Sequence, residues 1–292
     1  MRRKTVVERC DSCAASDCCV IRNSRTSPSR QSIYSSSSNI RLHSELVKCR
    51  RCELVFVSSR NRQTELSEAY AEAVDLVHSE DASNRIASFS RAMSRLARRV
   101  KDLGTRGVLV DIGCASGEFP YAASQFGFDV IAYEPSRHLS SLGRERYNLD
   151  IRSGIFRTTD FQPGSVNVVT LWDVLEHLES PSLMLQDVHE VLKERGLLIL
   201  NLPMIDTLSC RLLRYRWPFF LEVHLFYFTR STIRNLLELH GFKVLHVQPY
   251  SQTLSSRYLV RRATGGRVTR FPVNVPFRYR LGQRTIVAQK VV

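Results

Sequence analysis

The sequence predicts an α/β protein with a parallel sheet, preceded by a small module built around paired cysteines. An apolar stretch at residues 108–112 leads into a glycine-rich turn and a helical pattern, the first half of a β-α-β unit. Two C-x-x-C pairs lie near the N-terminus. We therefore expect a zinc-ribbon-like module over residues 1–62, a helical connector over 63–103, and the α/β domain with an Arg-rich C-terminal segment over 104–292.

Charge is distributed unevenly along the 292 residues, which carry a formal net charge of +14. Residues 1–62 contribute +8 and residues 251–292 contribute +9, whereas residues 63–250 carry −3. The net charge of the middle of the chain therefore gives no reason to expect that this part binds a nucleic-acid backbone. No run of about 20 apolar residues indicates a membrane span, and no apolar core of a secretory signal follows the basic start. We expect a cytoplasmic protein.

Four cysteines form the two C-x-x-C pairs: Cys10, Cys13, Cys49 and Cys52. Each pair can aim two thiolates at one ion, so together they predict a tetrahedral structural zinc site. Ala14 and Glu53 stand where such knuckles usually have glycine, at a cost of about 1 kcal/mol each if the same turn forms. A Ser-rich stretch at 24–38 predicts a flexible loop between the pairs, and the apolar residues at 46–57 predict short strands. A metal-free hairpin is the alternative.

The connector has helical periodicity. From Ile86 to Leu103, apolar residues recur every three or four positions, and Gly104 is expected to end the helix. The arginines of this stretch lie off the apolar stripe and predict a solvated helix face: Arg91, Arg95, Arg98 and Arg99.

An acidic residue marks each of the first two predicted strands of the α/β domain. Asp111 lies directly before the turn from Gly113 to Gly117, and Glu134 ends the next strand. The N–H groups of such a turn face a ligand, and an acid at the tip of the second strand can accept both hydroxyls of a ribose. The G-x-x-x-G spacing differs from the G-x-G-x-x-G of dinucleotide-binding domains.

From about residue 105 to 250 the sequence resembles the class I S-adenosylmethionine-dependent methyltransferases. The matching segments are Val108–Phe119, Tyr133–Ser136, Val168–Leu178, Ser182–Pro203 and Val223–Phe242. One branch of this superfamily carries a zinc ribbon before its catalytic domain, as the paired cysteines suggest here. These motifs are highly specific for the superfamily and weakly specific for the substrate.

The resemblance implies a Rossmann-like seven-stranded methyltransferase sheet, mostly parallel, with an antiparallel last strand at residues 283–290. It implies S-adenosylmethionine as the cofactor, bound by Asp111, Gly113, Ala115, Gly117, Glu134, Pro135, Ile155, Trp172 and Asp173. In this family Asp111 anchors the loop and reaches the methionyl ammonium, and Glu134 takes the ribose hydroxyls. Ala115 replaces the usual Gly or Ser, and Ile155 stands where an acid near the adenine is common. Cys114 is expected to be a buried, unreactive thiol.

Asp173, Glu176 and His177 have the spacing of one helical face, next to the expected position of the cofactor's sulfur. Three interpretations stay open. Asp173 and Glu176 form a capping box with His177 packed locally; or His177 is a general base or orients the acceptor; or the three bind a divalent metal, as a similar arrangement does in some related quinone-biosynthesis O-methyltransferases.

His224 is the second candidate base. It follows an aromatic-rich segment at residues 214–222, in a region that commonly covers the acceptor pocket in this fold. The alternative is that His224 belongs to an aromatic core patch.

Three functions are compatible with these features. We favour O-methylation of a small-molecule acceptor, such as a sugar or glycan precursor, by in-line methyl transfer. The second is RNA methylation, in which the zinc module and the basic ends hold RNA. The third is a non-catalytic interaction protein that binds the cofactor, against which the intact glycine motif and Glu134 argue.

Overall fold

The computed structural model describes residues 9–24, 44–58, 81–100, 103, 107–221, 223–263 and 273–291. Seven strands form the main sheet: β4 (Val108–Ile112), β5 (Asp129–Glu134), β6 (Asp150–Ser153), β7 (Val166–Trp172), β8 (Leu192–Pro203), β10 (Phe242–Pro249) and β13 (Gln283–Lys290). Their order is β6-β5-β4-β7-β8-β13-β10. Only β13 runs antiparallel to its neighbours β8 and β10 in this described sheet. The predicted fold class is confirmed, and the last strand has the predicted bounds.

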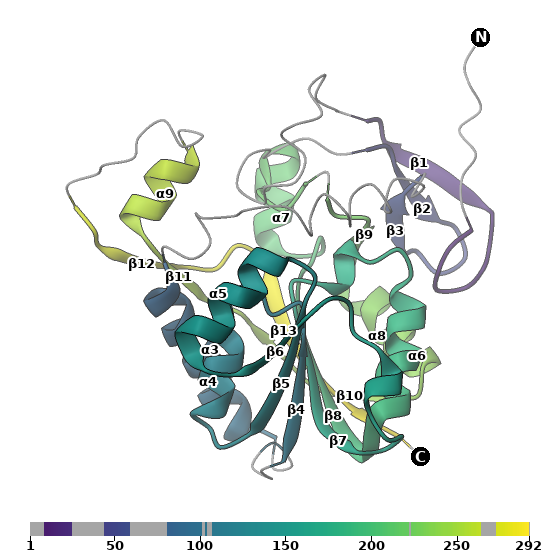
Figure 1. Cartoon of the computed structure of the whole chain (residues 1–292). Coiled ribbons are helices and arrows are strands. Elements are labelled where there is room, and N and C mark those ends of the chain that lie inside the picture. Colours follow the sequence, from purple (N-terminus) through teal and green to yellow (C-terminus); the bar gives the residue numbers. More distant parts are fainter. Residues whose placement is uncertain are drawn as a thin grey trace.

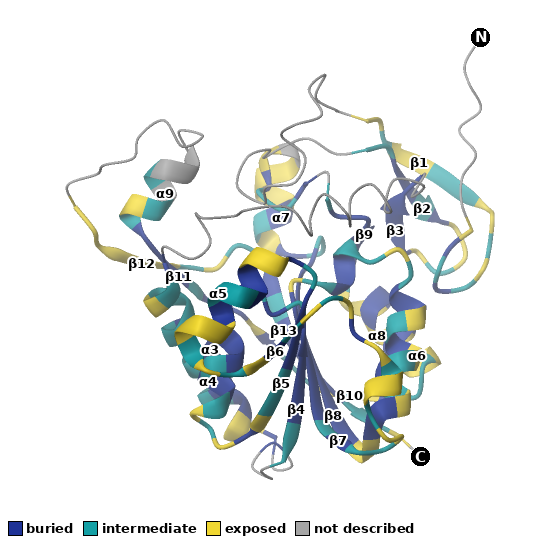
Figure 2. Ribbon diagram, in the orientation of Figure 1, coloured by how far each residue is buried: buried dark blue, intermediate teal, exposed yellow. Residues whose placement is uncertain are grey.

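Seven α-helices are described: α3 (Ala82–Ala97), α4 (Glu118–Ser124), α5 (Arg137–Tyr147), α6 (Pro181–Val191), α7 (Leu208–Leu213), α8 (Arg230–Leu239) and α9 (Ser256–Ala263). Figure 1 shows α3, α4 and α5 on one face of the sheet and α6 and α8 on the other. The central strands are rich in Val, Leu and Ile and are buried on both faces, as a covered parallel sheet requires (Figure 2). This arrangement brings the carboxyl ends of β4, β5 and β7 to one edge.

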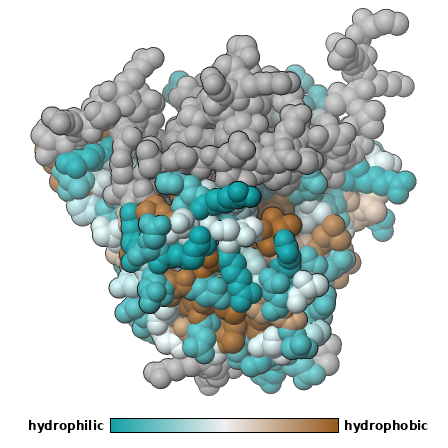
Figure 3. Space-filling view, in the orientation of Figure 1, coloured by the Kyte–Doolittle hydropathy of each residue, from teal (hydrophilic) through white to brown (hydrophobic). Residues whose placement is uncertain are grey.

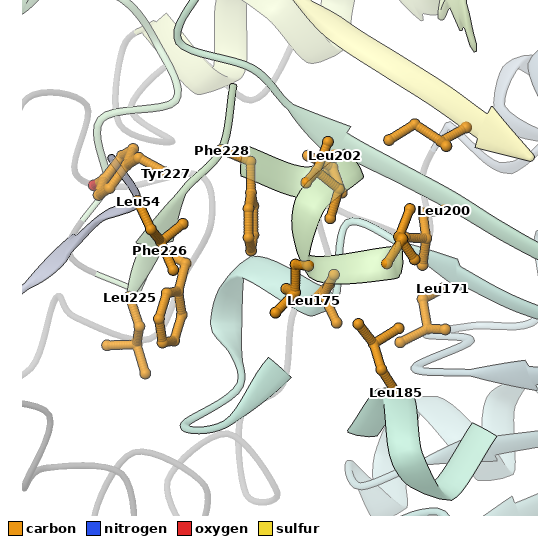
Figure 4. Packing of buried hydrophobic residues seen from close by; sticks show 14 of the residues in the cluster. Leu54, Leu171, Leu175, Leu185, Leu200, Leu202, Leu225, Phe226, Tyr227 and Phe228 are labelled. Atoms are coloured by element: carbon orange, nitrogen blue, oxygen red, sulfur yellow. The ribbon is translucent and has the colours of Figure 1, made fainter. Parts of the chain in front are cut away.

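The N-terminal module is joined to the α/β domain by a shared sheet. Its strands β1 (Cys18–Arg22), β2 (Leu46–Cys49) and β3 (Val55–Val57) pair antiparallel, and β3 also pairs with β9 (Phe226–Tyr227) from the α/β domain. Figure 4 shows Phe226 and Phe228 lying between Leu54 of the module and Leu175 of the α/β domain. The two parts therefore share one hydrophobic core.

A second contact fixes the module to helix α6. The Asp11 carboxylate accepts hydrogen bonds from the Ser180 hydroxyl at 2.6 Å and from the Ser182 backbone N–H at 2.9 Å. The Ser182 hydroxyl donates in turn to the Asp11 carbonyl oxygen at 3.0 Å. An aspartate from the module thus satisfies a free N–H at the start of this helix, where negative charge is favourable.

The connector helix packs into the α/β domain. Phe89, Met93 and Leu96 of α3 lie in one cluster with Phe119 and Trp172. The α-helix ends at Ala97, earlier than predicted, and a turn follows in which the N–H groups of Arg99 and Val100 both donate to the Leu96 carbonyl. The expected helix over 63–80, the glycine at 104 and most of the Ser-rich loop lie outside the described residues.

The C-terminal segment returns to α3. Strands β11 (Gln252–Ser255) and β12 (Pro276–Tyr279) pair antiparallel, and the Ser255 N–H donates to the Asp81 carboxylate at 2.8 Å. The side chains of residues 261–270, which hold several of the arginines, lie outside the described part. In the described chain, no helix combines the length and apolar character that crossing a membrane requires. The described surface in Figure 3 mixes hydrophilic side chains with smaller hydrophobic areas.

Candidate functional site

The turn between β4 and α4 is a tight glycine loop at the carboxyl edge of the sheet. Gly113 and Gly117 have φ of +76° and +87°. A Cβ at Gly113 would lie 2.6 Å from Val174 Cγ2, and one at Gly117 would lie 2.9 Å from Ile151 Cδ1. Both positions therefore require glycine. Ala115 also adopts a left-handed conformation, with φ of +49°, at a cost of about 1 kcal/mol.

Glu134, at the tip of β5, ties this loop to the neighbouring strand. Its carboxylate accepts hydrogen bonds from the backbone N–H groups of Ala115 and Ser136, each at 2.8 Å. Burial raises the pKa of Glu134 to about 7, and the two N–H bonds act in the opposite direction. The loop is therefore tied to a buried acid, at the position where the sequence predicts a ribose-binding carboxylate.

Asp111 lies beneath the loop and is buried. Its carboxylate accepts a hydrogen bond from the Thr170 hydroxyl at 2.5 Å. Burial raises its pKa well above the ordinary range, and the negative charge of Glu134 adds to the effect. The thiol of Cys114 is buried as expected, and burial and the neighbouring acids raise its pKa, so it is a poor nucleophile.

The remaining predicted cofactor residues lie at the same edge in different environments. Pro135 is half-buried beside Glu134. Ile155 is 68% exposed, so its side chain is available to a flat ligand. Trp172 is buried, with its ring 4.8 Å from that of Phe119 and 5.5 Å from that of Tyr250.

Asp173 does not cap a helix, so the capping-box interpretation is wrong. Its carboxylate accepts hydrogen bonds from the Asn201 amide at 2.9 Å and the Gln283 amide at 2.7 Å, and its φ is +57°. Only a three-residue 3-10 helix, Leu175–His177, follows, and no side chain caps it. Asp173 has an exposed surface, but desolvation by the protein around its carboxyl raises the pKa of Asp173 to about 6. The hydrogen bonds from Gln283 and Asn201 act in the opposite direction.

The structure brings both candidate histidines together around Glu176. Ligand atoms of Glu176, His177 and His224 all lie within 4.8 Å of one another, and the two imidazole rings are 4.7 Å apart, edge to face. His177 Nδ1 lies 2.9 Å from the Val223 carbonyl oxygen and therefore carries the proton. Neither Glu176 carboxyl oxygen nor His224 Nδ1 has a hydrogen-bond partner among the described residues.

Burial controls the protonation of this cluster. It raises the pKa of Glu176 well above its usual range, with a contribution from Asp173. It lowers the pKa of His177, and it lowers that of His224 further because the two rings are adjacent. Both imidazoles are therefore neutral at pH 7, which is the form that accepts a proton or binds a metal.

The four predicted zinc ligands also form a cluster. The Sγ atoms of Cys10, Cys13, Cys49 and Cys52 all lie within 4.8 Å of one another. Ala14 and Glu53 have φ of +56° and +65°, so the knuckle turns form without glycine. Their N–H groups donate to the carbonyls of the first cysteine in each pair, at 2.8 and 3.0 Å. Four thiolates in this arrangement fit a tetrahedral zinc ion.

Sequence reasoning missed several residues that support the site. Thr170 and Asn201 are polar residues within apolar runs of their strands, which was the available signal, whereas Gln283 begins a strand of mixed polarity and had none. Arg85 of α3 approaches Glu118 at 3.5 Å, just after the glycine loop. It is one arginine among several in a basic helix, so no pattern distinguished it.

The chain was compared with known families, curated proteins and solved structures. A family model described as "Methyltransferase domain" matches residues 82–247. No curated protein matches the chain. Similar solved structures include a SAM-dependent methyltransferase from Thermotoga maritima (17% identity, 69% of this chain and 90% of that chain, TM-score 0.46) and one from Archaeoglobus fulgidus (16%, 69% and 94%, 0.47). A Haemonchus contortus N-methyltransferase complexed with S-adenosylhomocysteine is similar at 14% identity (69% and 53%, TM-score 0.45).

The family match spans more than half of the chain and contains the glycine loop, Glu134 and the Glu176–His177–His224 cluster. The sheet has the seven strands and the antiparallel last strand that the resemblance implied. The chain belongs to the methyltransferase-domain family and is an S-adenosylmethionine-dependent methyltransferase.

Proposed function

We propose that the protein methylates a hydroxyl group of a small molecule, such as a sugar or glycan precursor. The observation that supports this most is the buried Glu176–His177–His224 cluster at the edge of the sheet that carries the glycine loop. A hydroxyl group must lose a proton as it is methylated, and a neutral buried imidazole can take that proton. An amine acceptor that reaches the site unprotonated needs no such base.

The cofactor fits the glycine loop and the acids beside it. Glu134 is the acceptor for the two ribose hydroxyls, and the loop from Gly113 to Gly117 is packed closely against Val174 and Ile151, which fixes the backbone that faces the cofactor. Asp111 is buried beneath the loop at the end of β4, where its carboxyl accepts a hydrogen bond from Thr170 of β7, and its raised pKa favours a neutral carboxyl that can hydrogen-bond the methionyl end of the cofactor. When bound, the cofactor supplies an electrophilic methyl group on a sulfonium.

His224 is the proposed general base. Its Nδ1 has no hydrogen-bond partner in the described chain and can accept the proton of the acceptor hydroxyl. Glu176 lies within 4.8 Å of this imidazole, and because burial favours its neutral, protonated form, its carboxyl can hydrogen-bond the ring without adding a charge. His177 is held by Val223 and orients this pair. The low pKa of His224 keeps it unprotonated before the reaction.

A divalent metal is the second candidate for the same cluster. One carboxylate and two imidazoles within 4.8 Å of one another can bind such an ion, and the ion would neutralise the buried Glu176. Asp173 lies outside this set of three, because its carboxylate is bonded to Asn201 and Gln283. Activity that survives a chelator supports the base, and activity that is lost and restored by a divalent ion supports the metal.

The four-cysteine module is proposed to bind structural zinc. One equivalent of zinc in purified protein supports this assignment. Less than half an equivalent, with unfolding unaffected by a chelator, contradicts it.

The acceptor is tested by a labelled-methyl assay. The protein is incubated with methyl-labelled S-adenosylmethionine and separated cell fractions: nucleic acid, lipid, glycan and small molecules. Label in the glycan or small-molecule fraction, with the Glu134→Gln variant as the background, supports the proposal. Label confined to RNA would show instead that the basic ends serve the RNA alternative.

A further inference from the structure

A surface recess of about 430 Å³ lies between helix α3 and the edge strand β10. Its lining is Arg95, Arg98, Arg99, His246, Val247, Gln248, Pro249 and Arg280. A smaller recess continues from it along α3 and shares Arg95, Gln248 and Pro249. The volume of the larger recess lies in the range of ordinary small-ligand sites, about 300–1,000 Å³. The glycine loop and the Glu176–His177–His224 cluster contribute no lining residue to either recess.

The charge in this recess is of one sign. Burial lowers the pKa of Arg95, and the positive charges of Arg278, Arg280, Arg91 and Arg98 lower it further. None of these arginines forms an ion pair with a carboxylate of the described residues. Like charges gathered this closely destabilise the free protein, and a bound anion removes that cost.

Neutral groups hold two of the arginines in place. Arg280 Nε donates to the Ser251 hydroxyl at 2.7 Å, and Arg91 donates to the Thr253 hydroxyl at 2.6 Å. These hydroxyls orient the guanidinium groups without neutralising them. His246 adds a buried Nε2 that has no hydrogen-bond partner among the described residues. The recess therefore presents oriented cations and a ring nitrogen, with no carboxylate among the described residues paired to these cations.

Phosphate is the anion that this chemistry fits. Guanidinium groups bind phosphate oxygens in a bidentate fashion, and several together match a group with two or three negative charges. The bounded volume favours a ligand of nucleotide size over a long strand, which needs a continuous track. We propose that the recess between α3 and β10 binds the phosphate groups of a nucleotide-sized ligand such as a nucleoside diphosphate. This site is distinct from the cofactor loop and does not depend on which acceptor is methylated.

Isothermal titration calorimetry tests the proposal with inorganic pyrophosphate and with UDP as probes. Saturating S-adenosylhomocysteine is present throughout, so that neither probe is measured at the cofactor loop. The expected result is one saturable site for each probe. Arg98→Gln and Arg95→Gln should each weaken binding about tenfold, as the loss of one charge-assisted contact does. Arg234→Gln, an exposed arginine of α8, is the matched control and should leave affinity unchanged.

Arg98 is exposed, so its substitution leaves the fold intact, and the heat of S-adenosylhomocysteine binding checks this in every variant. No saturable binding of either probe, or equal affinity in the Arg98→Gln and Arg234→Gln variants, overturns the proposal. It is also overturned if only a 20-nucleotide RNA binds, with a salt dependence that reports many phosphate contacts. Failure of the methyltransferase assignment would instead appear as lost S-adenosylhomocysteine binding, a separate readout.

Discussion

The backbone N–H of Val57 donates a hydrogen bond to the carbonyl oxygen of Leu225 at 2.9 Å. Val57 lies five residues after the zinc-ligand candidate Cys52, and Leu225 directly follows His224. The Leu225 N–H in turn donates to the Glu176 carbonyl at 2.8 Å. A continuous path of backbone hydrogen bonds therefore joins the four-cysteine module to the neighbour of the proposed base, and we expect the module to position His224.

Loss of zinc is expected to slow methyl transfer without weakening cofactor binding. Cys52→Ser removes one proposed zinc ligand. We expect β3 to become less ordered, and with it the paired strand β9 and the nearby His224. We expect turnover to fall at least about tenfold while S-adenosylhomocysteine affinity changes less than about twofold, since Glu134 and the glycine loop lie elsewhere. Cys19→Ser, in the same module but outside the cluster, is the control. Equal turnover in the two variants would show that the module does not position the base.

Removing the Asp11 carboxylate is expected to destabilise the protein by about 1–3 kcal/mol, because two donors at the start of α6 lose their acceptor. The measurement is the free energy of unfolding of Asp11→Ala by denaturant. Asp17→Ala removes an exposed acid whose ion pair with Arg50 spans 3.4 Å, and it should cost less than about 0.5 kcal/mol. If both variants lose the same stability, Asp11 does not fasten the module to α6.

Replacing His224 is expected to abolish most turnover. A general base contributes typically 10²–10⁴-fold, so His224→Ala should lower kcat by about that factor while the affinity for S-adenosylmethionine stays unchanged. His138→Ala, an exposed histidine of α5, serves as the control. Denaturant unfolding of both variants separates lost chemistry from lost stability. Full turnover by a folded His224→Ala protein would place the base elsewhere.

Cofactor affinity is expected to rise with pH up to about 7. The pKa of Glu134 is about 7 in the free protein, above its ordinary value of 4.5, so below pH 7 its carboxyl is protonated and accepts poorly from ribose hydroxyls. The dissociation constant should rise up to about tenfold for each pH unit below 7 and level off above it. Because the folded pKa is raised, ionisation of Glu134 also lowers the free protein's stability from about pH 4.5 to 7. A flat affinity profile from pH 5.5 to 8 would contradict this assignment.

Local patterns predicted the elements whose signal lies in one short segment. The glycine loop, Asp111 and Glu134 are examples, since the spacing of the glycines and the acids that follow apolar strands indicate them, whereas the last strand was predicted from the family resemblance. The knuckles were also predictable, and the structure shows that Ala14 and Glu53 accept the left-handed turn.

The sequence could not predict features that depend on distant partners. β9 has two residues, and it forms because β3 offers it an edge. Asp173 and Glu176 match a capping box in sequence, but the amides of Asn201 and Gln283 take the Asp173 carboxylate and no full helix follows. The sequence predicted a solvated face for the arginines of α3. In the structure, Arg278 of β12 lies close enough to lower the pKa of Arg95.

The most direct test of the account is a calorimetric titration of S-adenosylhomocysteine into the wild-type protein and the Glu134→Gln variant at pH 8. Glutamine keeps the shape of the side chain but replaces one acceptor oxygen with a donor, so the ribose hydroxyls lose part of their anchor. We expect one site per chain in the wild type and at least about tenfold weaker binding in Glu134→Gln. Glu145→Gln, on the neighbouring helix α5, should bind as the wild type does. Equal affinity in Glu134→Gln and the wild type would contradict the placement of the cofactor at the glycine loop.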